Sequence, residues 1–246
     1  MKRYLWITLG VTAYWLGFTF NAWGQEETES LDIQLRVFSD RRLEGLHLYQ
    51  ERGDSPLLQF FTGSVSPVYR YQGSNPIYFF RKVASPTEED PNAVVRVPVA
   101  RFEAPPNASA MLLLFFPDRN APEGTERYVL YGVDEDESAF PFGSVRLINL
   151  NNQTFEALIG GRPQSIRPGA NPPVAVSPGV TSIGVVRQIN GRYHKAYENF
   201  IRLSANQRAW LILYPPFLRN AVEVTPRLLI EDKANREEER IVHATR

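Results

Sequence analysis

The chain has 246 residues, with 27 basic and 27 acidic side chains, no cysteine, and an aromatic content of 12%. The lack of cysteine excludes disulfides, cysteine nucleophiles and thiolate metal sites. The even balance of charge argues against nucleic acid as a partner, because nucleic-acid-binding domains carry a clustered basic surplus, and it also argues against a polybasic membrane patch. A chain of this length can bury one large core or two ordinary ones.

The N-terminus has the pattern of a secretory signal. Two basic residues are followed by an uncharged, mostly apolar run over residues 4–20, and Ala22-Trp23-Gly24 places small residues at the −3 and −1 positions of a cut before Gln25. We therefore expect a signal peptide over residues 1–24, a mobile polar leader over residues 25–30, and a periplasmic or extracellular location. Cleavage would remove two of the 27 basic side chains and none of the 27 acidic ones, leaving a net charge of −2. No later segment is apolar enough to cross a bilayer, so we expect no stable membrane span after cleavage; a retained signal anchor is the alternative.

Short strands are predicted along the first part of the chain, separated by turns rich in Gly, Pro, Asn and Ser. They cover residues 31–38, 46–50, 57–61, 68–71, 77–82, 94–102, 111–116 and 128–133. Residues 31–38 alternate apolar and polar side chains, which predicts a half-buried strand. Residues 111–116 are continuously apolar, which predicts a central strand buried on both faces. Pro98 lacks an amide hydrogen, so we expect an edge strand or a bulge where it stands.

The second part of the chain is predicted to contain a similar series of strands. They cover residues 145–149, 155–159, 174–176, 183–188, 197–202, 209–214 and 227–230. Asn190-Gly191, between two of these strands, is the strongest hairpin signal in the chain, because both residues tolerate positive φ.

Several landmarks occur twice, in the same order and at similar spacing. They are Leu35-Arg36-Val37 with Val145-Arg146-Leu147, Val65-Ser66-Pro67 with Val176-Ser177-Pro178, and residues 107–117 (NASAMLLLFFP) with residues 206–216 (NQRAWLILYPP). The last two segments are identical at five of eleven positions. Such self-similarity predicts two copies of one supersecondary plan.

These patterns predict an all-β fold of two tandem antiparallel β-sandwich (immunoglobulin-like) domains. We expect repeat 1 over residues 31–133, an acidic linker over residues 134–139, repeat 2 over residues 140–231 and a charged tail over residues 232–246. Two halves of one larger body are the alternative to two separate domains.

No motif for a catalytic centre or a cofactor is present. The chain lacks the Gly-x-Ser-x-Gly elbow, the zinc-protease helix motif, the phosphate-binding loop and the Gly-x-Gly-x-x-Gly fingerprint. Among its three histidines, His47 is expected to point away from Leu46 and Leu48, toward solvent. His194 lies beside a predicted turn, and His243 lies in the tail. We therefore expect no catalytic residues, no cofactor and no enzyme activity, although a site assembled from distant residues stays open.

The acidic linker contains the candidate metal ligands. Asp134 and Asp136, together with Ser138, offer hard oxygen atoms at alternate positions, and calcium takes about six to eight such oxygens. The EF-hand pattern is absent, so a solvated charged linker that binds no metal is the interpretation we favour.

Aromatic residues gather between positions 69 and 80. Tyr69 and Tyr71 share one face of a predicted strand, and Tyr78, Phe79 and Phe80 follow in the next strand. Aromatic faces stack on sugars and anchor protein interfaces, so Tyr69 and Tyr71 form a small binding platform if they point outward. The interpretation we favour is that these rings fill a sandwich core.

Arg52-Gly53-Asp54-Ser55-Pro56 forms a predicted turn between strands and resembles the integrin-adhesion loop of fibronectin type III domains. Gly, Asp, Ser and Pro suit any such turn, so we favour a purely structural turn.

Residues 140–150 (FPFGSVRLINL) resemble a segment of uncharacterised exported bacterial proteins with β-sandwich repeats, in which an FPxGS-type segment follows an acidic linker. The resemblance implies an exported repeat protein and implies no activity.

The missing catalytic motifs and the expected fold lead us to expect a non-catalytic binding or scaffolding protein of the bacterial envelope. It would act through sheet faces, edges or loops, and its partner would be an envelope protein or polysaccharide. One alternative is a carbohydrate-binding module that uses an aromatic face near Tyr69 and Tyr71. Another is an enzyme that processes envelope polymers at the domain junction.

Overall fold

The structure, a computed structural model, describes residues 30–59, 62–85, 90, 92–118, 120–122, 127–216, 218 and 221–236. The predicted signal peptide, and all of the predicted leader except Ser30, lie outside these residues. In this part of the chain no helix combines the length and the hydropathy needed to cross a membrane.

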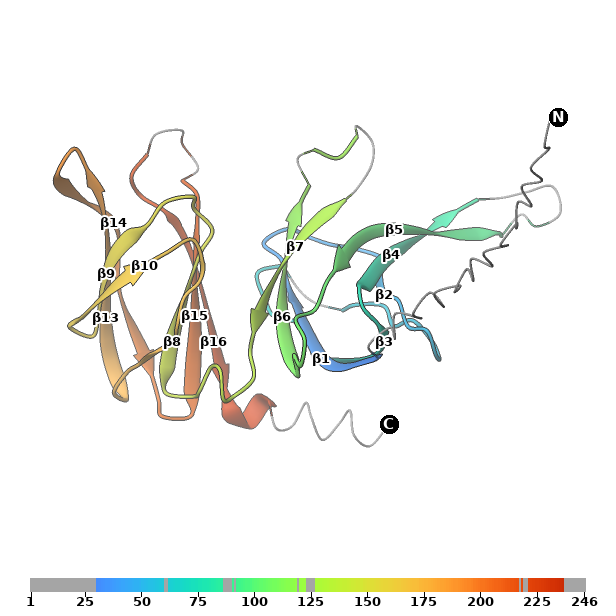
Figure 1. The fold of residues 1–246 in the computed structure, drawn as a ribbon, viewed down its shortest axis with the longest axis horizontal. Coiled ribbons are helices and arrows are strands. Elements are labelled where there is room, and N and C mark those ends of the chain that lie inside the picture. Colours follow the sequence, from blue (N-terminus) through green and yellow to red (C-terminus); the bar gives the residue numbers. More distant parts are fainter. Residues whose placement is uncertain are drawn as a thin grey trace, which may run out of the picture.

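The described chain is built from strands, so the prediction of an all-β fold is confirmed (Figure 1). The first copy contains β1 (Ser30–Phe38), β2 (Leu46–Leu48), β3 (Tyr69–Ser74), β4 (Ile77–Ala84), β5 (Val94–Phe102), β6 (Ala110–Pro117) and β7 (Tyr128–Asp134). The second copy contains β8 (Ser144–Asn149), β9 (Phe155–Ile159), β10 (Arg162–Ile166), β11 (Gly169–Ala170), β12 (Val174–Ala175), β13 (Gly179–Ile189), β14 (Arg192–Leu203), β15 (Gln207–Tyr214) and β16 (Thr225–Asp232). One helical turn, residues 233–236, follows β16.

The strands of the described residues form four sheets. Sheet A has the order β3-β1-β6-β7, and sheet B has the order β2-β4-β5. Sheet C has the order β11-β8-β15-β16, with β12 also paired to β8, and sheet D has the order β10-β9-β13-β14. Sheets A and B therefore belong to the first copy, and sheets C and D belong to the second.

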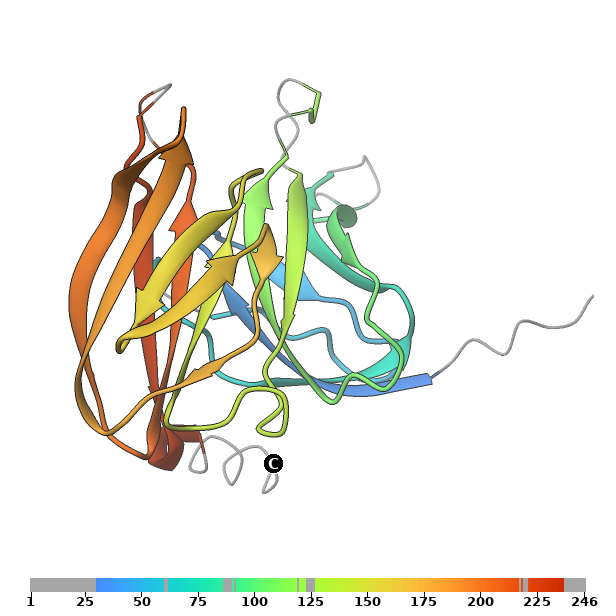
Figure 2. The same cartoon turned by 60° about the vertical axis from the view of Figure 1, so that its left-hand side comes forward.

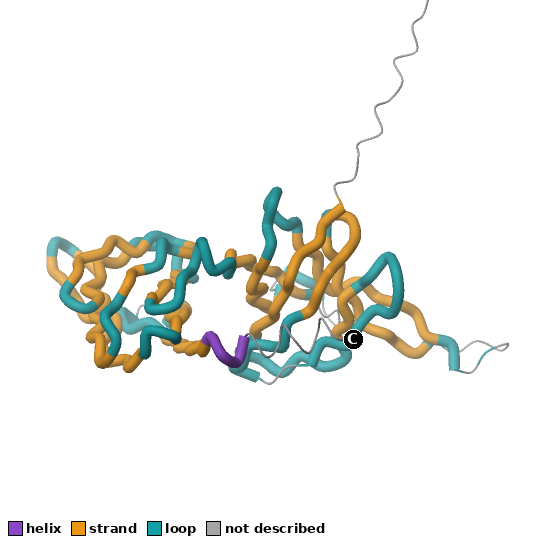
Figure 3. The backbone as a smooth tube through the Cα atoms, turned by 90° about the horizontal axis from the view of Figure 1, so that it is seen from below, coloured by secondary structure: helices purple, strands orange, loops and turns teal. Residues whose placement is uncertain are grey.

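Three apolar clusters hold the sheets together in the order B, A, C, D. One cluster fills the space between sheets A and B, and a second fills the space between sheets C and D. The third cluster joins the copies, and it contains Phe38, Leu112, Leu114 and Val133 of sheet A, Ile148, Trp210, Ile212 and Leu229 of sheet C, and Phe140 from the connecting segment. Figures 2 and 3 show the two halves next to each other, and Figure 3 shows the helical turn at their boundary.

Each copy contains one parallel pair of strands at a corresponding place. β1 runs parallel to β6 and β8 runs parallel to β15, while the other pairs among the described strands are antiparallel. The expected antiparallel pattern needs a correction at these two pairs, because long connections leave the direction of the later strand free. The immunoglobulin-like topology and the expected domain bounds stay predictions.

The strand register corrects the alignment of the two copies by one residue. Arg36 faces Leu112 in the β1–β6 pair, and Arg146 faces Trp210 in the β8–β15 pair. Matching the two arginines therefore matches Leu112 with Trp210, whereas the sequence comparison matches Met111 with Trp210. A shift of one residue moves every side chain of a strand to the opposite face of the sheet. In the corrected register Leu112 and Trp210 both face the contact between the copies, while Met111 faces the core of its own copy.

Three local predictions are confirmed. Residues 110–115 of β6 are buried, because the strand has the core of its own copy on one face and the second copy on the other. Pro98 lies in β5, which is the edge strand of sheet B and contains a bulge opposite β4. Asn190 and Gly191 have φ values of 50° and 77° and form a two-residue hairpin between β13 and β14.

Two predictions of which segments form strands differ from the structure, and several bounds also differ, such as residues 197–202 where the structure has β14 (Arg192–Leu203). Residues 57–61 do not form a strand in their described part, where Leu57 makes an isolated bridge with His47; residues 60 and 61 are not described. β10 and β11 are missing from the prediction because Pro163 and Gly169 indicate turns. Both strands lie at sheet edges. Pro163 has no amide hydrogen to donate, and an edge strand can accommodate it because one side of the strand has no partner.

Candidate functional site

Tyr69 and Tyr71 do not form an outward platform. Both rings pack against the cluster between sheets A and B, and Tyr71 has 1% of its surface exposed. The Tyr71 hydroxyl donates to the Ser74 carbonyl oxygen at 2.6 Å, and the Gln59 amide donates to the Tyr69 hydroxyl at 2.6 Å. The interpretation that Tyr69 and Tyr71 fill a core is confirmed, and the alternative of an outward platform is wrong, because this face of β3 turns toward the core and the hydroxyls find backbone partners.

The acidic linker is a series of tight turns around one buried carboxylate. The Asp136 amide donates to Asp134 Oδ1 at 2.9 Å, and the Ser138 amide donates to Asp136 Oδ1 at 2.9 Å. Ser109 donates to the other Asp136 oxygen at 2.7 Å. Glu135 is 1% exposed, so the linker is not solvated throughout. Within the described ranges, no three His, Asp or Glu side chains gather as a metal ion requires.

Five of the charged side chains buried where the two copies meet form one network of ion pairs. We call them the junction cluster: Arg36, Glu135, Arg208, Glu231 and Arg236. The Arg36 guanidinium lies between the two carboxylates, 2.5 Å from Glu135 Oε2 and 2.5 Å from Glu231 Oε1. Arg208 Nε donates to Glu231 Oε2 at 2.6 Å, and Arg236 Nη1 lies 3.4 Å from the same oxygen.

Burial and ion pairing compete at the arginines of the junction cluster. Burial disfavours the charged form of Arg36, but the carboxylates of Glu135 and Glu231 outweigh it and raise the pKa of Arg36. At Arg208 burial outweighs the attraction of Glu231, and the pKa is lowered. Both carboxylates are engaged by guanidinium groups, so the junction cluster fastens the copies together and presents no unpaired acid or base.

The beginning of the predicted charged tail takes part in this contact. Asp232 ends β16, and the helical turn that follows brings Arg236, which is 5% exposed, to Glu231. Lys233 Nζ lies 2.9 Å from Glu137 Oε1. Residues 237–246 are not described.

The two histidines in the described part of the chain, His47 and His194, lie in different sheets, B and D. His47 points away from the buried Leu46 and Leu48, as predicted, but its ring stacks on Phe80 instead of facing solvent alone. His194 is exposed in β14, and His243 lies outside the described residues.

A polar groove of about 590 Å³ lies beside the turn that contains Arg52, Gly53 and Asp54. Arg70 Nε and Nη2 donate to the two carboxylate oxygens of Asp32 at 2.8 and 2.5 Å in this groove. The hydrogen bond from Arg70 lowers the pKa of Asp32 from 3.8 to about 2. Gly53 has a φ of 81°, so the backbone of the turn requires a glycine there. The purely structural turn stays the interpretation we favour, and an adhesive role stays an untested alternative.

The outer face of sheet B carries aromatic and basic side chains together. Alternation along β4 sends Ile77 and Phe79 into the core and places Tyr78, Phe80 and Lys82 on the opposite face. Cross-strand partners on the same face are His47 opposite Phe80, Pro98 opposite Phe80, Arg96 opposite Lys82 and Arg101 opposite Tyr78. We call the outward side chains the basic aromatic face: His47, Tyr49, Tyr78, Phe80, Lys82, Arg96 and Arg101.

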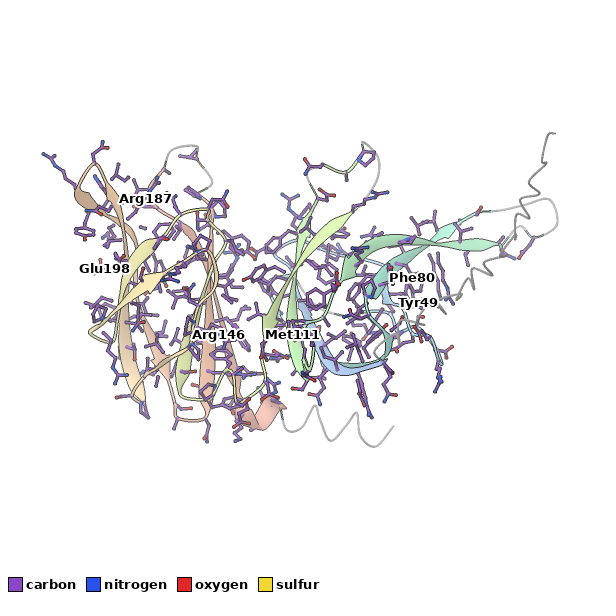
Figure 4. All side chains as sticks on the ribbon, viewed as in Figure 1. Tyr49, Phe80, Met111, Arg146, Arg187 and Glu198 are labelled. Carbon is purple, nitrogen blue, oxygen red and sulfur yellow. The ribbon has the colours of Figure 1, made fainter. Side chains whose placement is uncertain are left out.

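Phe80 is the centre of the basic aromatic face. The His47 ring stacks on it with a centroid distance of 5.2 Å, and the Tyr49 ring meets it edge-on at 6.4 Å. The Arg96 guanidinium lies 5.1 Å from the Phe80 centroid, a cation–π contact. These neighbours leave Phe80 only 3% exposed, whereas Tyr78 is 40% exposed. Figure 4 shows Tyr49 and Phe80 together at the end of the molecule that is far from the second copy.

The charges of this face have no carboxylate partners in the described chain. Lys82, Arg96 and Arg101 are exposed, and none of them forms an ion pair with a described Asp or Glu. The face therefore combines three positive charges with one accessible phenol ring.

Tyr78 and Phe80 belong to the aromatic run noted in the sequence, but the face they form was not predicted. Alternation over residues 77–82 is the signal that separates them from the core residues Ile77 and Phe79. The other members of the face come from β2 and β5, and only the strand register brings them to β4.

Comparison with known proteins does not assign the chain to a family. No protein-family model matches the chain, and no curated protein matches its sequence. The resemblance of residues 140–150 to exported repeat proteins therefore stays a prediction, and a functional conclusion rests on the geometry of the molecule.

Proposed function

We propose that the chain is an exported, non-catalytic binding or scaffolding protein of the bacterial envelope, with the basic aromatic face as its ligand surface. The observation that carries this proposal is that three exposed cations, Lys82, Arg96 and Arg101, share one face of sheet B with the exposed ring of Tyr78. Cations that have no carboxylate partner among the described residues attract negative charge, and an exposed aromatic ring stacks on flat or apolar ligand surfaces. Export rests on the N-terminal pattern alone.

The fold supports this role because it holds the face on regular strands. Sheet B is the outermost layer of the first copy, and sheet A covers the inner side of the part around Leu48, Phe79 and Ala100 through a shared apolar cluster. β4 and β5 continue beyond the sandwich as a two-stranded arm (Figure 1). Sites on packed strands keep their side chains in place better than sites on loops.

The junction between the copies supports a non-catalytic role. General acid–base catalysis needs a group that can exchange a proton with a substrate. Glu135 and Glu231 are instead buried and paired with arginines. These two carboxylates therefore do not support an enzyme site at this junction.

Site-specific photo-crosslinking tests the proposal. A photoreactive Tyr78→p-benzoylphenylalanine variant is expressed in the native host and irradiated, and its crosslinked products are compared with those of Tyr193→p-benzoylphenylalanine. Tyr193 is a matched control, because it is 65% exposed but lies at the tip of the β13–β14 hairpin. We expect one dominant crosslinked envelope component from position 78 and none from position 193. Equal crosslinking from both positions, or none from position 78, would contradict the proposal.

A further inference from the structure

We infer that the basic aromatic face binds an acidic polysaccharide, a chain of sugars that carry carboxylate or sulfate groups. This inference rests on the proposed function, since it names the ligand of the same face. It follows from the charge of the face, the spacing of its cations and the kind of ring that it exposes.

The cations are spaced for a polymer rather than for a single small anion. Arg96 and Lys82 are direct cross-strand partners, so their Cβ atoms lie about 5 Å apart. Arg101 is five residues further along β5, which corresponds to about 15 Å along an extended strand. One small anion cannot contact all three side chains, whereas a chain with a charge on successive sugars can.

The aromatic part of the face suits sugar rings. Tyr78 is exposed between the cross-strand partner Arg101 and the rings around Phe80, so it offers one open ring with a polar hydroxyl at its edge. A sugar has an apolar C–H surface and polar edges, and a tyrosine complements both. The Arg96 guanidinium already lies over the Phe80 ring. This contact holds its charge on the surface along which a bound sugar chain would run.

The rest of the molecule disfavours the other common polyanions. Proteins that bind nucleic acid carry an overall basic surplus, but this chain has 27 basic and 27 acidic side chains. A face that lies on an anionic membrane needs apolar side chains on the side of its cations. Of the exposed valines of the arm, Val83, Val95 and Val97 alternate with Lys82 and Arg96 and therefore point to the opposite face, and Val94 alone among the described ones lies on the side of the cations.

The test measures the affinity of the protein, purified from the envelope, for polygalacturonate and for a neutral galactan of similar length. We expect the protein to bind polygalacturonate at least tenfold more tightly than the neutral galactan. Its affinity for polygalacturonate should fall when NaCl is raised from about 50 to about 300 mM, because salt screens exposed charges. The triple variant Lys82→Ala/Arg96→Ala/Arg101→Ala should lose about a hundredfold in affinity, at roughly fivefold per cation. Tyr78→Ala should lose up to about tenfold.

Matched variants on sheet D control for charge and exposure. Arg192→Ala/Lys195→Ala/Arg202→Ala removes the same number of cations from exposed positions of β14, and Tyr193→Ala removes a more exposed ring. Both control variants should bind polygalacturonate like the unmodified protein. Far-ultraviolet circular dichroism confirms that each variant is folded.

The outcomes separate the ligand class from the proposed function. Equal affinity for the neutral galactan, lost in Tyr78→Ala, would overturn the acidic ligand and leave the face as the ligand surface. Tighter binding to single-stranded DNA or to phosphatidylglycerol vesicles than to polygalacturonate would also overturn it. The inference would also be overturned if the protein bound neither polymer, or if the triple variant bound polygalacturonate as tightly as the unmodified protein. The proposed function is tested separately, by crosslinking from position 78.

Discussion

At the scale of single residues, burial of charge sets this chain apart from an ordinary β-sandwich. Arg36 stands on the polar side of an alternating strand, and such a position is normally solvated. It is instead 5% exposed, because the second copy covers that face of β1. The sequence cannot show this burial, since the partners Glu135 and Glu231 are remote and only packing of the two copies brings them to Arg36.

Loss of one carboxylate from the junction cluster should be costly. Glu231→Gln removes the charge that faces Arg36 and Arg208, and we expect the free energy of unfolding to fall by about 3 to 5 kcal/mol, because a buried charge is left unpaired. Glu198→Gln is the control, since its partner Lys195 and Glu198 itself are both more than half exposed, and it should change stability by less than about 1 kcal/mol. Urea denaturation measures both values. Similar small losses in the two variants would show that the junction cluster contributes little.

The pair of Asp32 and Arg70 makes a smaller, pH-dependent contribution. Arg70 lowers the pKa of Asp32 from 3.8 to about 2 in the folded protein, so the stabilisation is fully present above pH 4 and is lost as the pH falls toward 2. Both side chains are more than half exposed, so its size should stay below about 1 kcal/mol. A carbon-detected NMR titration should place the Asp32 midpoint near 2, and Arg70→Ala should return it toward 3.8. A midpoint near 3.8 in the unmodified protein would contradict the ion pair.

At the scale of elements, local signals account for the strands that the sequence predicts well. The predicted bounds of β5 and β9 agree with the structure, because apolar alternation and flanking turns are properties of the segment itself. β10 and β11 lie at edges and contain turn residues, so their pairing depends on neighbouring strands. The basic aromatic face is predictable only in part. Alternation predicts which side chains of β4 point outward, but the register of β4 with β5 does not follow from the sequence.

The β13–β14 hairpin offers a test of turn chemistry. Gly191 has a φ of 77°, a conformation that costs a residue with a side chain about 1 to 2 kcal/mol, so Gly191→Ala should destabilise the protein by that amount. Gly184 lies in β13 without a positive φ, and an added Cβ there meets open space. Gly184→Ala should therefore change stability by less than about 1 kcal/mol, and in the stabilising direction. Thermal unfolding followed by circular dichroism compares the two, and equal effects would contradict the assigned turn.

At the scale of the whole molecule, the two copies form one body through sheets A and C. The sequence indicates the repeat but not this contact, because the residues that make it, such as Leu112 and Trp210, lie in strands that look like ordinary core strands. Domains joined by a small polar interface move independently, whereas a buried apolar interface couples them. The cluster around Phe140 and Trp210, together with the junction cluster, is of the second kind.

Coupling of the copies predicts a single unfolding transition. From residue 25 onward Trp210 is the only tryptophan, and it is 1% exposed between the copies, so its fluorescence reports on the contact itself. We expect the urea transition seen by Trp210 fluorescence to coincide with the transition seen by far-ultraviolet circular dichroism. A fluorescence transition at lower urea would show that the copies separate before they unfold.

The central claim is that the ligand surface lies on sheet B, and hydrogen exchange measured by mass spectrometry tests it most directly. The protein is labelled with and without saturating polygalacturonate, and protection is compared between β4–β5 and β13–β14. We predict slower exchange over residues 77–84 and 94–102 when the polymer is bound, and unchanged exchange over residues 179–203. Protection confined to residues 179–203, or protection absent from sheet B while binding is measurable, would contradict the account.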